Sequence, residues 1–94
     1  MKKPVVISVG GSLINPGQIQ LDFLKHLQAL ISKSNHSFII VCGGGANART
    51  YAASAKEFGV IGDDLDEIGI KATLLNAELL RHILSAGPVQ QKPI

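Results

Sequence analysis

The chain has 94 residues, of which 46% are hydrophobic and 17% charged, with nine basic and seven acidic residues. This composition is too apolar for a disordered chain, and the length allows one small domain or a part of a larger one. The charges are scattered and tryptophan is absent, which argues against nucleic-acid binding through a basic surface or a stacking platform.

Membrane insertion and secretion are also not indicated by the sequence. The longest apolar run, residues 38–42, is too short to cross a bilayer, and the apolar stretch near the N-terminus is too short for a signal peptide. We therefore expect a soluble cytoplasmic protein. The single cysteine, Cys42, excludes an internal disulfide framework. The three histidines lack metal-ligand spacing, so we expect structural or surface roles for them and no metal site in the chain (His26, His36 and His82).

Two short runs of β-branched and aliphatic residues predict strands over residues 4–9 and 38–42. Their near-continuous apolarity is typical of strands covered on both faces, as in a parallel sheet. Two such strands alone would leave both edges of the sheet open, and exposed apolar edges favour aggregation. We therefore expect further chain, or a partner, to complete the sheet.

Three helices are predicted, over residues 19–32, 46–58 and 64–86. The first has apolar residues at helical spacing (Leu21, Leu24, Leu27, Leu30 and Ile31). The second is rich in alanine, with Gly59 expected as a left-handed C-terminal cap. The third opens with acidic residues that suit the positive end of the helix dipole, and Gly87 and Pro88 are expected to end it. Its predicted apolar face comprises Leu65, Ile68, Ala72, Leu75, Leu79 and Ile83. The order β-α-β-α-α, with a right-handed crossover, indicates an α/β fold.

A glycine cluster follows each predicted strand, at residues 10–12 and 43–45. Glycine at such a junction permits positive φ and close approach of a ligand, and successive N–H groups can form an anion-binding nest. The alternative is a pair of tight turns without a ligand, but two clusters at equivalent strand ends favour a shared anion site. Neither cluster matches a P-loop or a dinucleotide fingerprint, which disfavours hydride transfer.

Charged residues near these clusters suggest how a phosphorylated ligand would be held. Arg49 lies about one helical turn beyond Gly45, where a guanidinium can bind phosphate, although a solvated surface arginine is the alternative. A carboxylate from residues 63–67 can accept hydrogen bonds from ribose hydroxyls, or these acids serve only as a helix cap. Because no nucleophile with an adjacent base is present, the pattern fits phosphoryl transfer by positioning and electrostatics.

The segments VVISVGGSL, FIIVCGGGANARTYA and DEIGIKATLLNAELL together resemble the amino acid kinase superfamily. Within it they are most similar to the uridylate kinases of the archaeal-type branch, over nearly all of residues 4–86. The resemblance implies a three-layer α/β/α sandwich with a mainly parallel sheet, usually in a homohexamer. It also implies Mg²⁺-dependent transfer of a phosphoryl group from ATP to UMP, in pyrimidine nucleotide synthesis.

The same resemblance assigns roles to matching positions. Gly10, Gly11 and Arg49 would stabilise phosphate, and no catalytic acid or base is identified. The residues implied at the ATP phosphates are Ser8, Val9, Gly10, Gly11, Ser12, Gly45 and Arg49. Gly44 and Asp66 would bind UMP, with Asp66 on the ribose, while Thr73 and Asn76 belong to the surrounding helix motif.

The sequence differs from the family pattern in two ways. Many members have a lysine where this chain has Ser8, so one positive charge is missing. Family members are also more than twice as long, so we expect residues 1–94 to be the N-terminal, UMP-facing part of the domain, without the C-terminal ATP-binding half. Such a piece alone should have little or no kinase activity. The alternatives are a sister kinase acting on acetylglutamate, aspartate, carbamate or isopentenyl phosphate, and a non-catalytic nucleotide-binding subunit.

Overall fold

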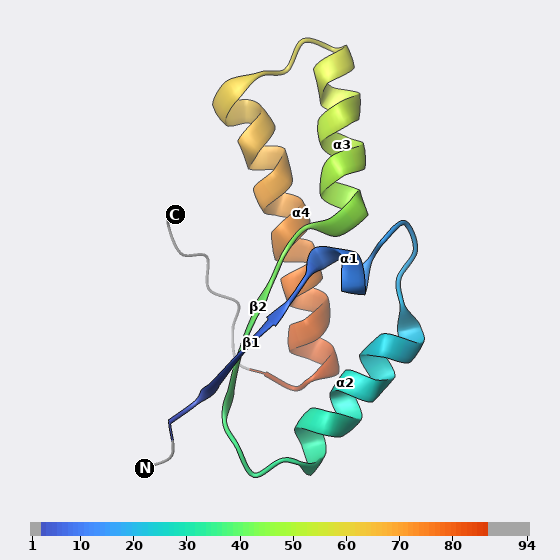
Figure 1. Cartoon of the computed structure of the whole chain (residues 1–94). Coiled ribbons are helices and arrows are strands. Elements are labelled where there is room, and N and C mark those ends of the chain that lie inside the picture. Colours follow the sequence, from blue (N-terminus) through green and yellow to red (C-terminus); the bar gives the residue numbers. More distant parts are fainter. Residues whose placement is uncertain (1–2, 87–94) are drawn as a thin grey trace.

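A computed structural model describes residues 3–86, which form two strands and four helices (Figure 1). The elements in chain order are β1 (Val5–Val9), α1 (Gly11–Ile14), α2 (Leu21–Lys33), β2 (Phe38–Cys42), α3 (Gly45–Glu57) and α4 (Gly62–Ile83). The predicted strands and long helices are therefore confirmed to within three residues at each end. The single turn α1 was not predicted, because four residues after a glycine pair are too few to show a helical period.

The two strands pair in parallel, in a register that runs from Val5 opposite Phe38 to Val9 opposite Cys42. Because alternate side chains point to opposite faces, Ile7 and Ile40 face the helices, whereas Val6 and Ile39 share the other face. Val6 is 64% exposed and Ile39 is 49% exposed. In the described residues the outer face of the strands is therefore uncovered, and these residues form two of the three expected layers.

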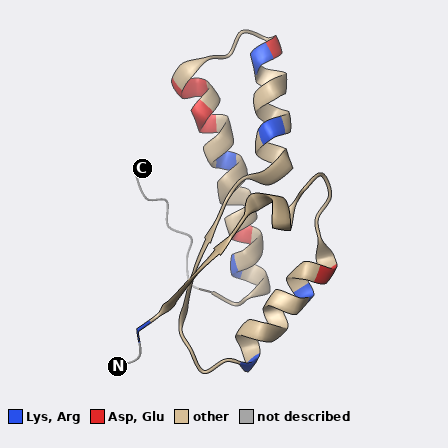
Figure 2. Cartoon of the chain, viewed as in Figure 1, with Lys and Arg blue, Asp and Glu red and all other residues tan. Residues whose placement is uncertain are grey.

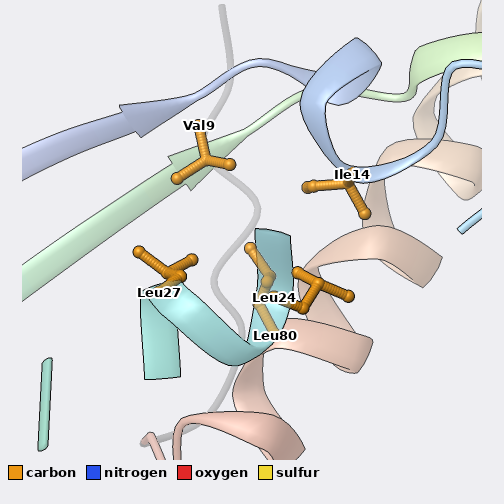
Figure 3. Close-up of a cluster of buried hydrophobic side chains, with 5 residues drawn as sticks. All are labelled: Val9, Ile14, Leu24, Leu27 and Leu80. Atoms are coloured by element: carbon orange, nitrogen blue, oxygen red, sulfur yellow. The ribbon is translucent and has the colours of Figure 1, made fainter. Parts of the chain in front are cut away.

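The hydrophobic core lies between the inner face of the sheet and helices α1, α2 and α4 (Figure 3). Its buried members come from four elements, so the core fixes the helices against the sheet (Val9, Ile14, Leu24, Leu27 and Leu80). Ile14, the last residue of α1, is fully buried. Its burial ties the segment after the first glycine cluster to the rest of the fold.

The apolar faces of the helices are narrower than the sequence predicts. On α2 only Leu24 and Leu27 are buried, and the flanking Leu21 and Leu30 are exposed. On α4 the buried stripe is Ala72, Asn76 and Leu80, at a spacing of four residues, while Leu75 is exposed. The predicted faces are wrong at these three leucines, because a two-stranded sheet covers too little area to bury a broad helical face.

Helices α3 and α4 form an antiparallel hairpin that extends beyond the sheet (Figure 1). Gly59 has a φ of +83°, and its N–H donates to the oxygen of Lys56. The N–H of Val60 donates to the oxygen of Ala55, so the pair forms a Schellman motif that satisfies the last carbonyl groups of α3. The predicted left-handed cap at Gly59 is therefore confirmed.

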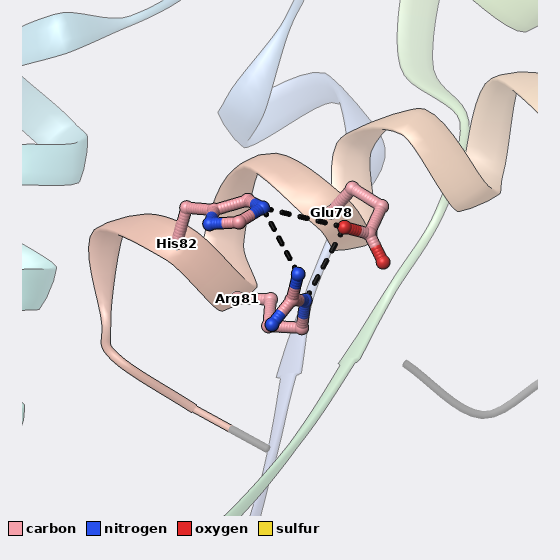
Figure 4. A network of polar contacts seen from close by, with 3 residues as sticks. All are labelled: Glu78, Arg81 and His82. Atoms are coloured by element: carbon pink, nitrogen blue, oxygen red, sulfur yellow. Dashed lines mark hydrogen bonds and ion pairs between the residues drawn. The ribbon is translucent and has the colours of Figure 1, made fainter. Parts of the chain in front are cut away.

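The last turns of α4 carry a polar cluster on the surface (Figure 4). Arg81 donates through Nε to the Glu78 carboxylate at 3.2 Å, and His82 Nε2 lies 3.5 Å from the same carboxylate. Nearby, Gln28 of α2 donates to the Ile83 oxygen at 2.9 Å, which links the two helices. The predicted stop at Gly87 and Pro88 lies outside the described residues. None of the helices described between residues 3 and 86 is long and apolar enough to cross a membrane.

Candidate functional site

The two glycine turns meet at one edge of the sheet. Parallel strands end at the same edge, so the chain after β1 and the chain after β2 leave the sheet side by side (Figure 1). A Cβ placed on Gly11 would fall on the amide nitrogen of Gly45 and lie 2.8 Å from its Cα. Because the backbones of the two turns touch, an anion cannot fit between them. It would bind on the surface that the two turns form together.

The second turn has the backbone conformation of an anion-binding nest. Gly44 is right-handed helical, with φ −84° and ψ −23°, and Gly45 has a φ of +64°. An alternation of this kind points successive N–H groups to the same side. Within residues 3–86, the hydrogen bonds of loops and caps do not use the N–H groups of Gly44 and Gly45. Both amides also lie at the start of α3, where intrahelical partners are lacking.

Two buried asparagines hold this arrangement through hydrogen bonds. The main-chain oxygen of Asn15 accepts from the Ala46 N–H at 2.9 Å, which joins the end of α1 to the start of α3. Asn76, on α4, donates through Nδ2 to the oxygens of Gly43 and Gly44, at 2.9 and 3.0 Å. Neither role was predicted from the sequence. The signal for Asn76 is its place four residues from both Ala72 and Leu80, which puts an amide in a buried helical stripe.

The remaining residues expected around the first turn lie in different settings. Ser8 is exposed on the outer face of the sheet, next to Val41 of β2. The side chain of Val9 is in the core, so only its main chain can face a ligand. Gly10 precedes α1 with φ −58°, and Ser12 is exposed within α1. The first turn therefore offers main-chain groups and one serine hydroxyl to a ligand.

Formal charge is absent from both glycine turns, and Figure 2 shows the charged residues on helices α2, α3 and α4 and near the start of the chain. Arg49, on the second turn of α3, is the nearest charged residue along the chain to the second glycine turn. Its side chain is exposed and is in no ion pair within the described part of the chain. A guanidinium in that position is free to bind an anion at the start of α3.

Asp66 lies farther along the hairpin, on the second turn of α4. It lines an open groove of about 390 Å³ together with Asp63, Glu67, Ile70 and Lys71. Thr73, seven residues later on the same helical stripe, lies beside Gly44, since a Cβ on that glycine would be 3.2 Å from its Oγ1. At 1.5 Å per residue, Asp66 is about 10 Å along the axis from Thr73. The carboxylate and the glycine turns therefore face one side of α4 without touching.

Metal coordination and thiol chemistry are not apparent in this region. Among residues 3–86, no group of three histidine, cysteine or acidic side chains is placed to hold a metal ion. Cys42 ends β2 and packs against the core, and burial raises the pKa of its thiol. A raised pKa keeps the thiol neutral at pH 7, in line with the role of a small hydrophobic residue.

Comparison with known proteins shows a consistent relationship. The sequence model of the amino acid kinase family matches residues 3–94. A protein named uridylate kinase from Thermoplasma volcanium is 40% identical over 91 residues, covering 95% of this chain and 40% of that protein. Another of that name, from Methanosarcina mazei, is 42% identical over 91 residues, covering 95% and 39%. A third, from Hyperthermus butylicus, is 35% identical over 94 residues, covering 98% and 41%. The chain thus spans about two fifths of the length of these relatives.

Proposed function

The chain belongs to the amino acid kinase family, and from this membership we propose that its protein is a UMP kinase, which transfers the terminal phosphoryl group of ATP to UMP and gives UDP. The observation that carries the proposal is the contact between the two glycine turns, with the free amides of Gly44 and Gly45 beside it. The relatives named uridylate kinase support UMP as the acceptor.

The proposed roles follow from the chemistry of each group. The amides of Gly44 and Gly45 bind the phosphate of UMP and the phosphoryl group in transfer, where negative charge is concentrated. Gly10, Gly11 and Ser12 lie on the other turn and bind the ATP phosphates. Arg49 adds a formal positive charge at the start of α3. Asp66 accepts hydrogen bonds from the ribose hydroxyls of UMP.

The glycine turns suit the phosphates of ATP but not a Mg²⁺ ion. The uncharged glycine turns suit phosphate oxygens, which need close approach to main-chain N–H groups. No carboxylate lies within the turns, and among residues 3–86 no group of three histidine, cysteine or acidic side chains is placed to hold a metal ion, so these residues do not fit a Mg²⁺ site. We therefore derive no catalytic step through the metal from this chain.

We also propose the wider setting from family membership. Residues 1–94 form the N-terminal, UMP-facing part of an amino acid kinase domain. The protein acts in the cytoplasm, in pyrimidine nucleotide synthesis, as a homo-oligomer. The open face of the sheet, with Val6 and Ile39 exposed, supports a fold that is completed by further structure.

A thermal-shift titration of the protein at its natural length tests the acceptor. UMP should raise the unfolding temperature more than CMP does, and acetylglutamate should have no effect. UDP formation from ATP and UMP then tests catalysis. Stabilisation by UMP without any UDP would favour a non-catalytic nucleotide-binding subunit, which the serine at position 8 also suggests. Stabilisation by acetylglutamate alone would contradict UMP as the acceptor.

The variant Asp66→Ala tests the proposed ribose contact. Loss of a charged acceptor should raise the KM for UMP by roughly tenfold or more, with little change in the KM for ATP. Asp64→Ala is the matched control, because Asp64 lies in the first turn of α4 and does not line the groove. A change confined to the KM for ATP would overturn the assignment of Asp66.

A further inference from the structure

We propose that Asn76 is a positioning residue for phosphate binding. Its carboxamide, which comes from the middle of α4, fixes the direction of the Gly44 and Gly45 amides and so forms the surface that receives the acceptor phosphate. The proposal rests on the proposed function for the identity of the ligand, and it adds a residue that acts on the phosphate through the main chain.

Asn76 is buried, and its carboxamide makes two partly buried hydrogen bonds to the glycine turn. The residue is 2% exposed, and its Nδ2 donates to Gly43 O at 2.9 Å and to Gly44 O at 3.0 Å. The carboxamide carries two N–H groups, so each can serve one of the two carbonyl oxygens. These are successive carbonyl groups of the chain, 33 and 32 residues away from Asn76 in the sequence.

Because the peptide unit is planar, a hydrogen bond that fixes the C=O group also fixes the direction of the N–H group in the same unit. In a trans peptide unit the C=O and the following N–H point to opposite sides. The carbonyl of Gly43 shares its peptide unit with the N–H of Gly44, and the carbonyl of Gly44 shares one with the N–H of Gly45; neither bond is cis. Because both carbonyl oxygens accept from Asn76, both N–H groups point away from its carboxamide, and the nitrogen of Gly45 lies against Gly11 of the facing turn.

Glycine makes this external support necessary. Residues 43–45 have no side chains that could hold the turn, and glycine has more backbone freedom than any other residue. Ala46 is already held through Asn15, so the unsupported peptide units are those that Asn76 binds. Two amides fixed before the ligand arrives bind an anion without the cost of ordering the loop.

The chemistry of the position favours asparagine over similar side chains. A leucine of similar size would leave the two partly buried carbonyl groups without donors, and an aspartate would place an acceptor against two acceptors. A serine or threonine supplies one O–H and can serve one carbonyl only. An amide that reaches both oxygens from a helix is therefore the side chain that the turn requires.

The test compares the affinities of UMP and uridine, because their ratio isolates the contribution of the phosphate. The measurements use isothermal titration, with competition for the weaker ligand, on the protein at its natural length. Asn76→Leu and Asn76→Asp should lower the ratio by roughly tenfold, equivalent to two weakened hydrogen bonds to an anion, and leave the affinity for uridine unchanged.

Leu80→Ala serves as the matched structural control. Leu80 lies one turn farther along the same buried stripe, and its apolar side chain cannot donate a hydrogen bond to the glycine turn. This variant should lower the unfolding temperature and keep the ratio of affinities. An unchanged ratio in a folded Asn76 variant would overturn the proposal, as would an equal fall in the ratio for Leu80→Ala.

A second measurement applies if the Asn76 variants do not fold or if UMP is not the ligand. In ¹⁵N-labelled unsubstituted protein, UMP should shift the amide resonances of Gly44 and Gly45, and uridine should not. If UMP does not bind at all, the proposed function fails, and inorganic phosphate then becomes the probe for the amides. Resonances of Gly44 and Gly45 that respond to neither UMP nor phosphate would show that Asn76 does not prepare an anion site.

Discussion

At Gly45 the backbone has a φ of +64°, and a Cβ there would stand 2.8 Å from the main-chain oxygen of Asn15. The residue therefore meets a conformational and a steric requirement at once. Gly11, on the facing turn, meets the second requirement only, because its missing side chain leaves room for the amide of Gly45. The two turns can touch because Gly11 and Gly45 have no side chains. Asn15 and Asn76 supply the hydrogen bonds that hold the turns.

The variant Gly45→Ala should be strongly destabilising. A left-handed conformation costs an L-residue about 1–2 kcal/mol, and the contact with Asn15 O adds to that cost. Urea unfolding should therefore show a loss of about 2 kcal/mol or more. Gly10→Ala is the control, because its φ is −58° and a Cβ there meets nothing within 4 Å. Equal stability of the two variants would contradict the described geometry of the second turn.

Arg49→Ala tests whether the exposed guanidinium acts on phosphate. Loss of a charge-assisted hydrogen bond should cost about 2 kcal/mol, seen as a fall of roughly thirtyfold in kcat/KM for phosphoryl transfer. Lys56→Ala is a suitable comparison, because Lys56 lies two helical turns farther on the same face of α3. If kcat/KM were unchanged in Arg49→Ala, the side chain would be a solvated surface arginine.

At the scale of elements, α4 connects the three parts of the site. Its first turns carry Asp66, its middle packs against the start of α3, and its buried stripe reaches the glycine turn through Asn76. Near Gly44 the close packing of the start of α3 on α4 is explicit, because a Cβ there would stand 3.2 Å from Thr73 Oγ1 and 3.7 Å from the oxygen of Gly69. One helix thus sets the distance between the ribose-binding carboxylate and the phosphate-binding amides that we propose.

Much of this level of structure is predictable from the sequence, and the reasons are local. Strand β2 has the predicted bounds because five apolar residues lie between a polar loop and three glycines. The cap at Gly59 follows from a glycine after an alanine-rich helix. Tertiary contacts are not encoded in this way. The role of Asn76 depends on residues 32 and 33 positions away, and the exposure of Leu75 depends on what covers the helix.

A pair of glycine substitutions tests the close packing around Gly44, at the start of α3. Gly69 lies inside α4, and a Cβ there would meet nothing within 4 Å, so Gly69→Ala should stabilise the protein by about 0.5–1 kcal/mol through helix propensity. Gly44→Ala should destabilise it, because its Cβ would overlap the Cβ of Ala48 in α3 and lie 3.2 Å from Thr73 Oγ1 of α4. Thermal unfolding measures both. The same sign for the two variants would be inconsistent with the close contact at Gly44.

At the scale of the whole molecule, the described chain is elongated, with extents of 49 × 29 × 17 Å, because the hairpin projects beyond the core (Figure 1). The outer face of the sheet carries Val6, Ile39 and Val41, all exposed. A contiguous apolar face of this kind favours association when nothing covers it. The same face is where an α/β sandwich places its second helical layer.

As an isolated polypeptide of 94 residues, the chain should self-associate through this outer face. The double variant Val6→Thr, Ile39→Thr keeps β-branched residues in the strands and should lower the association, as measured by sedimentation velocity. Leu21→Gln removes an exposed apolar side chain from α2 instead, and it should leave the association unchanged. A monomeric chain at high concentration, or an equal effect of Leu21→Gln, would argue against association through the sheet.

The position of the acceptor phosphate tests the central claim most directly. In crystals of the protein at its natural length grown with UMP, the phosphate oxygens should lie within about 3 Å of the Gly44 and Gly45 amide nitrogens. The ribose hydroxyls should then donate to the Asp66 carboxylate. A UMP phosphate bound away from both glycine turns, with these amides facing solvent, would contradict the account.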